Sequence, residues 1–457
     1  MHLNSWLKAI AGLSVFAFTP AYADVPEAPA EVGFQTLITD SINDEVLSFQ
    51  LKTAATAIQN NYFGNDEAVF DKHASSWYEA AILIGDTTLW RSSGAGNFAA
   101  AFEMLGLTTG GYDPTFTNID SKNVNRFELN QLAIGWQSGD ILSLGENALS
   151  ISAGRQRFTI GSGFLIWKGG TDGGRHGTPW LGVHNTWSNT GLVNLAVNDH
   201  IRLDAFYLTP NDQPNTDTQI YGINGDFLLP LDVSLGASFI EIFDSNTPER
   251  RHTRVYDLRW GYQQDEDFGL QMSAEWVFQE QPSRRQSGGA NAGKKGGENR
   301  EAWYAEAGWL FDGALPARLS YRYANFESGY DPLYPGSSGW GSWRQGEYLG
   351  QFVLRNENLQ SHQAHFEVSP IDGWSLHTIY YYFLVNRKNE GQFADSQIVM
   401  TDERLAQEID LVSHADFGNG WTSNLVAMVV IPSEGGKQWS GGKQTVFGAV
   451  FDLQYAF

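Results

Sequence analysis

Hydrophobic and polar residues alternate along most of the chain, in runs of about ten residues that turn-forming residues separate. In the run 253–263 the apolar side chains share one face: Tyr256, Leu258, Trp260 and Tyr262. This pattern predicts β-strands, because successive side chains of a strand point to opposite faces of its sheet. Each predicted strand therefore has one apolar face and one polar face.

The alternation predicts eighteen strands. We expect them at 46–59, 76–91, 95–109, 125–138, 148–160, 188–197, 200–209, 217–229, 232–243, 252–263, 268–279, 300–311, 317–327, 361–370, 374–387, 404–416, 420–432 and 443–457. An even number is typical of a single-chain bacterial barrel. The segment 348–355 also alternates, but a nineteenth strand would break this parity, so we assign it to a loop.

The connections between these strands alternate in length. The short ones are 230–231, 264–267, 312–316, 371–373 and 417–419, and the long ones include 161–187, 280–299, 328–360 and 388–403. In bacterial barrels the short turns lie in the periplasm and the long loops lie outside. This assignment places both ends of the barrel in the periplasm.

The apolar faces point inward in a soluble sandwich and outward in a barrel that lies in lipid. Aromatic residues near the strand ends favour the barrel, because such residues form girdles at membrane interfaces. The chain also ends with Phe451, Leu453, Tyr455 and Phe457 on one face, an ending that resembles the sorting signal of bacterial outer-membrane barrels. We therefore expect an all-β, closed antiparallel barrel over 46–457, with outer-membrane lipid and, through Phe457, the barrel-assembly machinery as partners.

The first residues have the features of a secretory signal peptide. Lys8 precedes a short apolar stretch at 9–18, and Ala21-Tyr22-Ala23 is an A-x-A cleavage site. We expect cleavage after residue 23 and export to the bacterial outer membrane. Residues 24–45, which contain proline, alanine and acidic residues, are expected to form a periplasmic lead-in to the barrel.

Composition excludes several classes of protein. The formal net charge of -23 makes a nucleic-acid partner unfavourable, and the lack of cysteine excludes disulfides and thiolate metal sites. No apolar run of the length of a transmembrane helix follows the first thirty residues. The sequence contains no metal or nucleotide motif, so we expect no cofactor; acidic loop residues could hold calcium but lack motif spacing.

Three short segments resemble one known family. They are the run 127–133 (FELNQLA), the run 154–163 with Gly154-Arg155-Gln156-Arg157-Phe158, and the run 326–336 with Asp331-Pro332-Leu333-Tyr334-Pro335. Together with the strand pattern over 76–457, they resemble the alginate export family of outer-membrane barrels. The resemblance implies an eighteen-stranded monomeric pore that passes a polyanionic polysaccharide through an arginine-rich lumen, with periplasmic export proteins as partners.

Charged side chains on the polar faces are candidate lumen residues, because charges at the narrowest part of a pore set its selectivity. The candidates for selectivity are Arg126, Glu128, Arg155, Arg157, Arg202, Arg259, Arg318 and Arg322. The arginines either form a ladder for an anionic cargo or pair with the inward-facing acids and stiffen the wall. The inward acids are numerous, and a lumen of mixed charge also suits a small anionic solute.

Two long loops contain candidate constriction residues. They are Trp167, Lys168 and Arg175 in one loop, and Asp331, Trp340 and Trp343 in the other. Tryptophan rings can stack on sugars inside the pore, or they can lie at the outer membrane interface.

The sequence thus predicts a passive outer-membrane channel for a polysaccharide, and three alternative functions remain open. One is a general or small-solute diffusion porin. Another is a barrel-borne hydrolase, for which the His–acid pairs are His365 with Glu367 and His414 with Glu408 and Asp410. The third is a surface adhesin whose pore is plugged.

Overall fold

The computed structural model describes residues 45–64, 74–92, 96–112, 123–139, 145, 147–169, 176–212, 215–265, 268–281, 299–336, 339–394 and 399–457. The predicted leader at 1–23 and nearly all of the lead-in at 24–45 lie outside these residues and stay predictions. The first strand begins at Glu45.

Eighteen strands make up almost all of the regular structure. They are β1 (Glu45–Gln59), β2 (Ala74–Ser92), β3 (Gly96–Tyr112), β4 (Asn123–Gln137), β5 (Leu149–Gln156), β6 (Trp187–Asn198), β7 (Ile201–Thr209), β8 (Gln219–Leu229), β9 (Val233–Asp244), β10 (Arg254–Gln263), β11 (Gly269–Glu280), β12 (Arg300–Phe311), β13 (Ala317–Phe326), β14 (Leu359–Ile371), β15 (Trp374–Val385), β16 (Arg404–Gly418), β17 (Trp421–Pro432) and β18 (Val446–Ala456). The predicted all-β fold with eighteen strands is confirmed.

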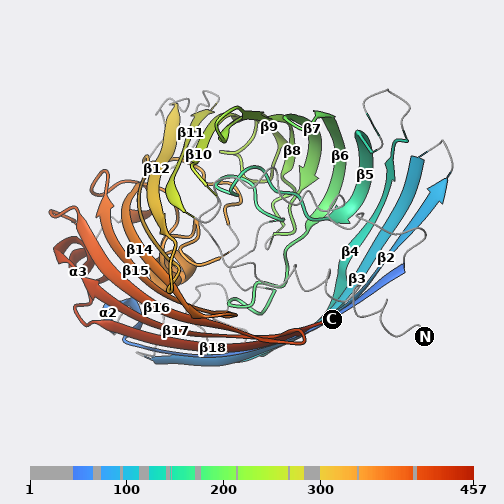
Figure 1. Ribbon diagram of the computed structural model, residues 1–457. Helices are drawn as coiled ribbons and strands as arrows, with labels where there is room; N and C mark the ends of the chain where they lie inside the picture. The colour runs from blue at the N-terminus through green and yellow to red at the C-terminus, as the bar shows by residue number, and fades with distance from the viewer. Residues whose placement is uncertain are drawn as a thin grey trace.

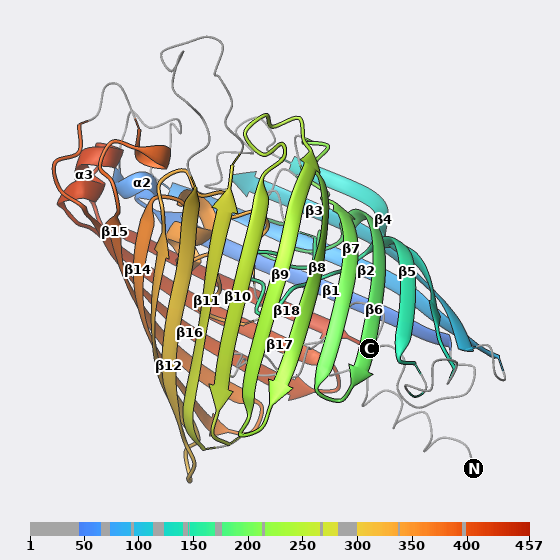
Figure 2. The ribbon, with the colours of Figure 1, turned by 90° about the horizontal axis from the view of Figure 1, so that it is seen from above.

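The strands form one closed antiparallel barrel (Figures 1 and 2). Each strand pairs with its sequence neighbours, and β1 closes the sheet by pairing with both β2 and β18. At the closing seam, Phe49 and Phe457 exchange two backbone hydrogen bonds of 3.0 Å. No strand edge is left open between β1 and β18, as a sheet in lipid requires.

Short and long connections alternate around most of the barrel, as the sequence predicts; the connection 138–148 between β4 and β5 is an exception, because it lies on the short-turn side but has eleven residues. β8 and β9 are joined by the turn 230–232, whereas β13 and β14 are joined by the long segment 327–358. The start of β1 and the end of β18 lie at the end of the barrel that carries the short turns. In the segment 348–355, residues 348–353 belong to a helix, η2 (Gly346–Val353), and the last two follow it without regular structure, so its assignment to the loop is confirmed.

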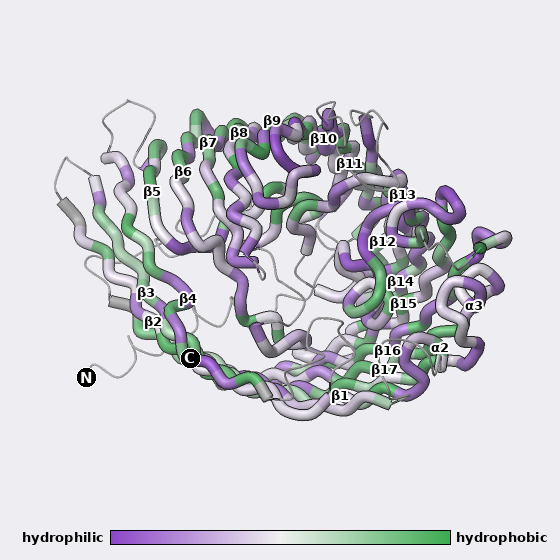
Figure 3. The backbone as a smooth tube through the Cα atoms, turned by 180° about the vertical axis from the view of Figure 1, so that it is seen from behind, coloured by the Kyte–Doolittle hydropathy of each residue, from purple (hydrophilic) through white to green (hydrophobic). Residues whose placement is uncertain are grey.

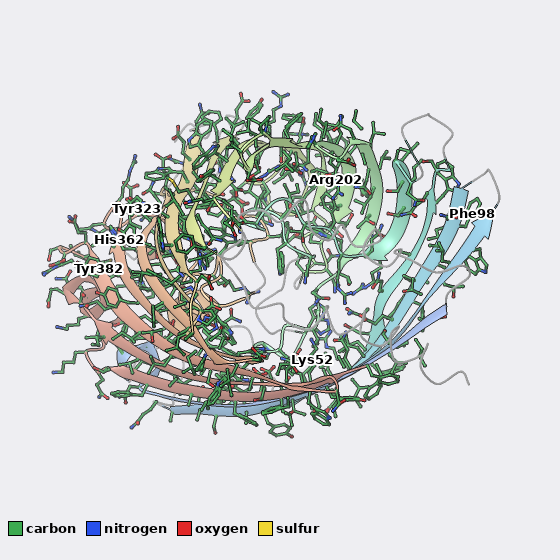
Figure 4. All side chains as sticks on the ribbon, viewed as in Figure 1. Lys52, Phe98, Arg202, Tyr323, His362 and Tyr382 are labelled. Carbon is green, nitrogen blue, oxygen red and sulfur yellow. The ribbon has the colours of Figure 1, made fainter. Side chains whose placement is uncertain are left out.

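The apolar faces of the strands point away from the lumen. Phe127 and Ile134 on β4 are 75% and 67% exposed, and Phe98 on β3 points outward in Figure 4. Figure 3 shows polar and apolar positions alternating along the strands. The orientation expected of a barrel in lipid is therefore present, and the soluble sandwich is excluded.

Short helices lie among the long loops. They are α2 (Asn61–Gly64), η3 (Gly391–Phe393) and α3 (Glu434–Ser440). Within the described part of the chain, none of the helices has the length and apolar character needed to cross a membrane.

Candidate functional site

Two long loops fold into the barrel and pair with each other. The first inner loop comprises residues 157–169 and 176–186 between β5 and β6, and the second comprises residues 327–336 and 339–358 between β13 and β14 (Figure 1). Ile166 and Tyr334 form a parallel β-bridge, and the amide of Trp167 donates to the carbonyl oxygen of Tyr334 at 2.9 Å. The two loops therefore form one unit inside the lumen.

An aromatic cluster fixes this unit to the wall formed by β12 and β13. Phe164 stacks on Phe326 with 5.6 Å between ring centroids and meets the edge of Trp343 at 5.1 Å. The indole nitrogen of Trp343 donates to the carbonyl oxygen of Ser162 at 2.9 Å. Tyr304 packs on the same indole. Burial of these large rings holds both loops against one side of the barrel.

The first inner loop also bonds to the sector formed by β18 and β2. The carboxylate of Glu79 on β2 accepts the backbone amides of Trp180 and Leu181, both at 2.9 Å. The indole nitrogen of Trp180 donates to Asp452 on β18 at 3.1 Å. Trp180 also lies against Trp340 of the second loop, with 6.2 Å between centroids. The paired loops thus extend from one side of the lumen to another.

Helix η2 of the second inner loop is held by acidic residues of β16. Glu408 accepts the backbone amides of Tyr348 at 2.6 Å and Leu349 at 3.0 Å. Asp410 accepts the amide of Glu347 at 3.3 Å. Burial and the nearby negative charge of Glu408 raise the pKa of Glu347 to about 7. The helix therefore introduces a carboxyl group whose charge changes near neutral pH.

The predicted constriction residues have different positions. Trp167, Lys168, Trp340 and Trp343 belong to the paired inner loops, and Trp343 is buried inside the barrel rather than at a membrane interface. Asp331 also belongs to the second inner loop, and it forms a bidentate ion pair with Arg250 of the loop between β9 and β10, at 2.6 and 2.8 Å. Arg175 lies outside the described residues.

Three predicted selectivity arginines pair with carboxylates; Arg259 and Arg318 are buried, and Arg322 is half-buried. Arg259 contacts Asp257 and donates to Asp226 at 2.9 Å. Arg318 and Arg322 share Glu306, at 2.8 and 2.7 Å. Arg322 also donates to the carbonyl oxygen of Gly341 at 2.8 Å and lies over the ring of Trp343. These contacts connect Arg259 and Arg318 to carboxylates of the wall, and Arg322 also to the second loop.

A second group of cations is only half-buried and lies near β1, β4 and β5. Lys52 points into the lumen (Figure 4), and the guanidinium of Arg157 donates to Glu103 at 3.1 Å and to Asn185 at 2.9 Å. Arg155 donates to the carbonyl oxygen of Asn130 at 3.0 Å, and Arg126 contacts His176 at 3.1 Å. We call these four residues the cationic sector.

The remaining two predicted residues also have inward positions. Arg202 lies on β7 two residues before the buried Asp204, on the same face of the strand (Figure 4). Glu128 lies on β4, and its carboxylate lies 2.8 Å from His184 Nδ1 of the first inner loop.

The backbone geometry that directs Arg155 and Arg157 toward the lumen differs from the predicted regular strand. The sequence interpretation places them on one face of a regular strand because they are two residues apart. In the structure the register shifts between Gly154 and Gln156, and β5 ends at Gln156. Gly154 has a φ of +131°, and a Cβ there would lie 2.2 Å from the carbonyl oxygen of Leu132. The glycine permits a bulge, so consecutive polar side chains turn inward.

Sequence reasoning missed the role of Glu79 and Glu408 as acceptors for loop amides. It also missed His184, whose partner Glu128 lies more than fifty residues away along the chain. No local period marks these contacts, because each joins a strand to a distant loop. His414 contacts Asn424 at 2.8 Å, while its proposed partners Glu408 and Asp410 hold η2.

The fold is that of the eighteen-stranded outer-membrane porins. The chain is similar to three crystal structures from Pseudomonas aeruginosa. OccK9 (OpdG) has 11% sequence identity and a TM-score of 0.59, and the match covers 91% of this chain and 98% of that chain. The outer membrane protein opdK has 11% identity and a TM-score of 0.58, with 90% of this chain and 98% of that chain covered. The outer membrane protein OprD has 12% identity and a TM-score of 0.57, with 91% of this chain and 94% of that chain covered. No protein-family model and no curated protein matches the sequence. The resemblance to the alginate export family receives no support from these comparisons.

Proposed function

We propose that the protein is an outer-membrane channel through which small polar solutes that carry an anionic group diffuse. The observation that supports this most strongly is the pair of inner loops, which bond to β12 and β13 on one side and to Glu79, Asp452 and Glu408 on others. A lumen divided by such loops suits a small solute better than a polymer. The likeness to porin structures is consistent with a channel.

The cationic sector supports the proposal that the solute carries an anionic group. Arg155 and Arg157 are half-buried in the lumen, whereas Arg259 and Arg318 are buried and matched by carboxylates. A cation that is partly hydrated and close to the pore can exchange its present partner for a passing carboxylate, because guanidinium forms bidentate hydrogen bonds with that group. The polysaccharide expected from the sequence resemblance is the competing cargo.

Solute passage through reconstituted protein distinguishes the two cargoes. Liposomes that contain the refolded protein should swell in small organic anions such as gluconate, and the rate should fall steeply as uncharged sugars increase in size. In planar bilayers, oligouronates should leave the conductance unblocked. A block by micromolar oligouronate would support the polysaccharide, and a lack of any conductance would support a plugged barrel and contradict the channel.

Substitution of the cationic sector tests the selectivity. Arg157→Gln should lower the ratio of anion to cation permeability in a bilayer with a salt gradient, because one lumen charge is lost. Arg404→Gln is the matched control, since Arg404 is exposed and pairs with Asp402 among the long loops. An unchanged permeability ratio for Arg157→Gln would contradict the assigned role of this sector.

A further inference from the structure

Two histidines and a glutamate gather on the lumen face of adjacent strands. His365 and Glu367 are two residues apart on β14, and His377 on β15 pairs directly with Glu367 in the barrel register. The exposed fractions of all three side chains are 5% or less. His365 Nε2 lies 3.1 Å from His377 Nδ1, and His377 Nδ1 lies 3.9 Å from a carboxylate oxygen of Glu367.

We propose that His365, Glu367 and His377 form a binding site for one divalent transition-metal ion, of which Zn²⁺ is the best probe. One ligand atom from each residue lies within 4.8 Å of the others. Tetrahedral ligands at ~2.0–2.1 Å from zinc lie about 3.3 Å apart, so the observed separations need only small side-chain rotations. Two imidazoles and one carboxylate suit zinc or a neighbouring transition metal better than calcium or magnesium.

A buried carboxylate oxygen provides a second observation that points to a cation. Glu367 Oε2 is buried and has no hydrogen-bond partner among the described residues. It is the oxygen that lies toward His377 Nδ1. Leaving a buried carboxylate oxygen without a partner is costly, and a metal ion at this point would satisfy it.

Ser375 orients His377 for metal binding. The hydroxyl of Ser375 lies 2.9 Å from His377 Nε2. A proton on Nε2 that is donated to this hydroxyl leaves the lone pair of Nδ1 directed toward His365 and Glu367, as outer-shell partners do in metal sites. When the metal binds, it takes the place of the hydrogen shared by the two imidazoles, and His365 carries its proton on Nδ1 instead, so that both histidines bind as neutral imidazoles.

The same residues do not form a hydrolase triad. In a Ser–His–acid triad the acid accepts a hydrogen bond from Nδ1 of the histidine. Here His365 holds that position at 3.1 Å, and Glu367 is 3.9 Å away, beyond hydrogen-bond distance.

The charges around the cluster are balanced. Arg318 and Arg322 face it from β13 and share Glu306, so Glu367 supplies the second negative charge. The second inner loop covers the cluster, because a Cβ built on Gly341 would lie 3.5 Å from His365 Nδ1. Bound zinc would add positive charge beside these arginines, close to where Arg322 holds this loop.

A second group of possible ligands is less suitable. Glu128, His176 and His184 also lie close together, but Arg126 contacts His176 Nδ1 at 3.1 Å. Burial, His184 and Arg126 lower the pKa of His176 to about 4, and Arg155 acts on the same group. Two guanidinium groups against one carboxylate repel an incoming cation.

Calorimetric titration of the detergent-solubilised full chain with Zn²⁺, without a histidine tag, tests the site. We expect one ion per barrel and a higher melting temperature with zinc. His365→Gln, Glu367→Gln and His377→Gln should each weaken binding by at least about tenfold. His362→Gln is the control on the same strand, because His362 lies on the lipid side among Tyr323 and Tyr382 (Figure 4).

The results separate the proposal from its competitors. Circular dichroism in the absence of zinc checks that each variant is folded. Loss of the single ion in the three variants, with retention in His362→Gln and His184→Gln, supports the site. The proposal is overturned if wild-type protein binds no zinc at millimolar concentration, if His365→Gln and His377→Gln bind as well as wild type, or if binding is lost only in His184→Gln.

Discussion

Glu306 shows how strongly a single residue can determine the stability of the lumen wall. It accepts hydrogen bonds from Arg318 and Arg322, and Arg318 is only 3% exposed. Removing one partner of a buried ion pair leaves an uncompensated charge, so Glu306→Gln should destabilise the barrel by about 3–5 kcal/mol. Urea unfolding in detergent micelles measures this change. Glu434→Gln, which removes an exposed partner of Lys437 on α3, should have little effect, and equal losses would contradict the prediction.

At the residue scale, the sequence predicts which face a charge occupies but not whether that charge is neutralised. Arg157 and Arg259 both appear as inward cations in the alternation. The structure differs because Arg259 has Asp226 and Asp257 on neighbouring positions of the wall, whereas Arg157 follows the bulge at Gly154 and meets Glu103 and Asn185 near the pore. Cross-strand neighbours and bulges depend on register, which alternation alone does not specify.

At the scale of elements, the strands are predictable and the inner loops are not. In a strand between lipid and water, apolar and polar side chains must alternate along the whole length. The run 253–263 therefore predicts β10 from its own residues, without reference to neighbouring strands. The bridge between Ile166 and Tyr334 joins residues far apart in the chain, and neither segment has a period that marks it. The helix η2 illustrates the same limit, because its apolar alternation resembles a strand.

The docking of η2 should depend on pH through Glu347. Its pKa is raised to about 7 from 4.5, so the folded protein retains the proton when the undocked carboxyl would lose it. Docking is therefore favoured at low pH and weakens as the pH rises from about 4.5 to about 7. Single-channel recordings between pH 5 and pH 8 should show more current fluctuation at the higher pH.

Glu347→Gln separates this effect from other titrations. The amide is neutral at all pH values, so the fluctuations of this variant should change less over that range than those of the wild-type protein. Glu390→Gln is a suitable control outside this loop, because Glu390 is exposed and pairs only loosely with Arg387 at 3.7 Å. A wild-type pH dependence that persists in Glu347→Gln would show that another group is responsible.

The orientation of the whole barrel follows from the alternation of its connections. Short turns are predicted in the periplasm, and because the chain has no cysteine, single cysteines can report their exposure. Lys437→Cys on α3 should react with a membrane-impermeant maleimide on intact cells. Leu315→Cys in the turn between β12 and β13 should react only after the outer membrane is permeabilised. The reverse labelling pattern would invert the topology.

Closure of the barrel depends on the last strand, β18, which pairs with the first strand, β1. Phe457 exchanges two backbone hydrogen bonds with Phe49, and its ring packs against those of Phe49 and Tyr455. The sequence also predicts that the barrel-assembly machinery recognises this residue. Phe457→Ala should therefore lower the fraction of heat-modifiable, folded protein in outer membranes. Phe311→Ala is the matched control, because both rings are 45% exposed and Phe311 lies at a short-turn end away from the seam. If both variants assemble equally well, the aromatic ring is only a membrane-interface residue, and closure relies on the backbone ladder between β1 and β18 alone.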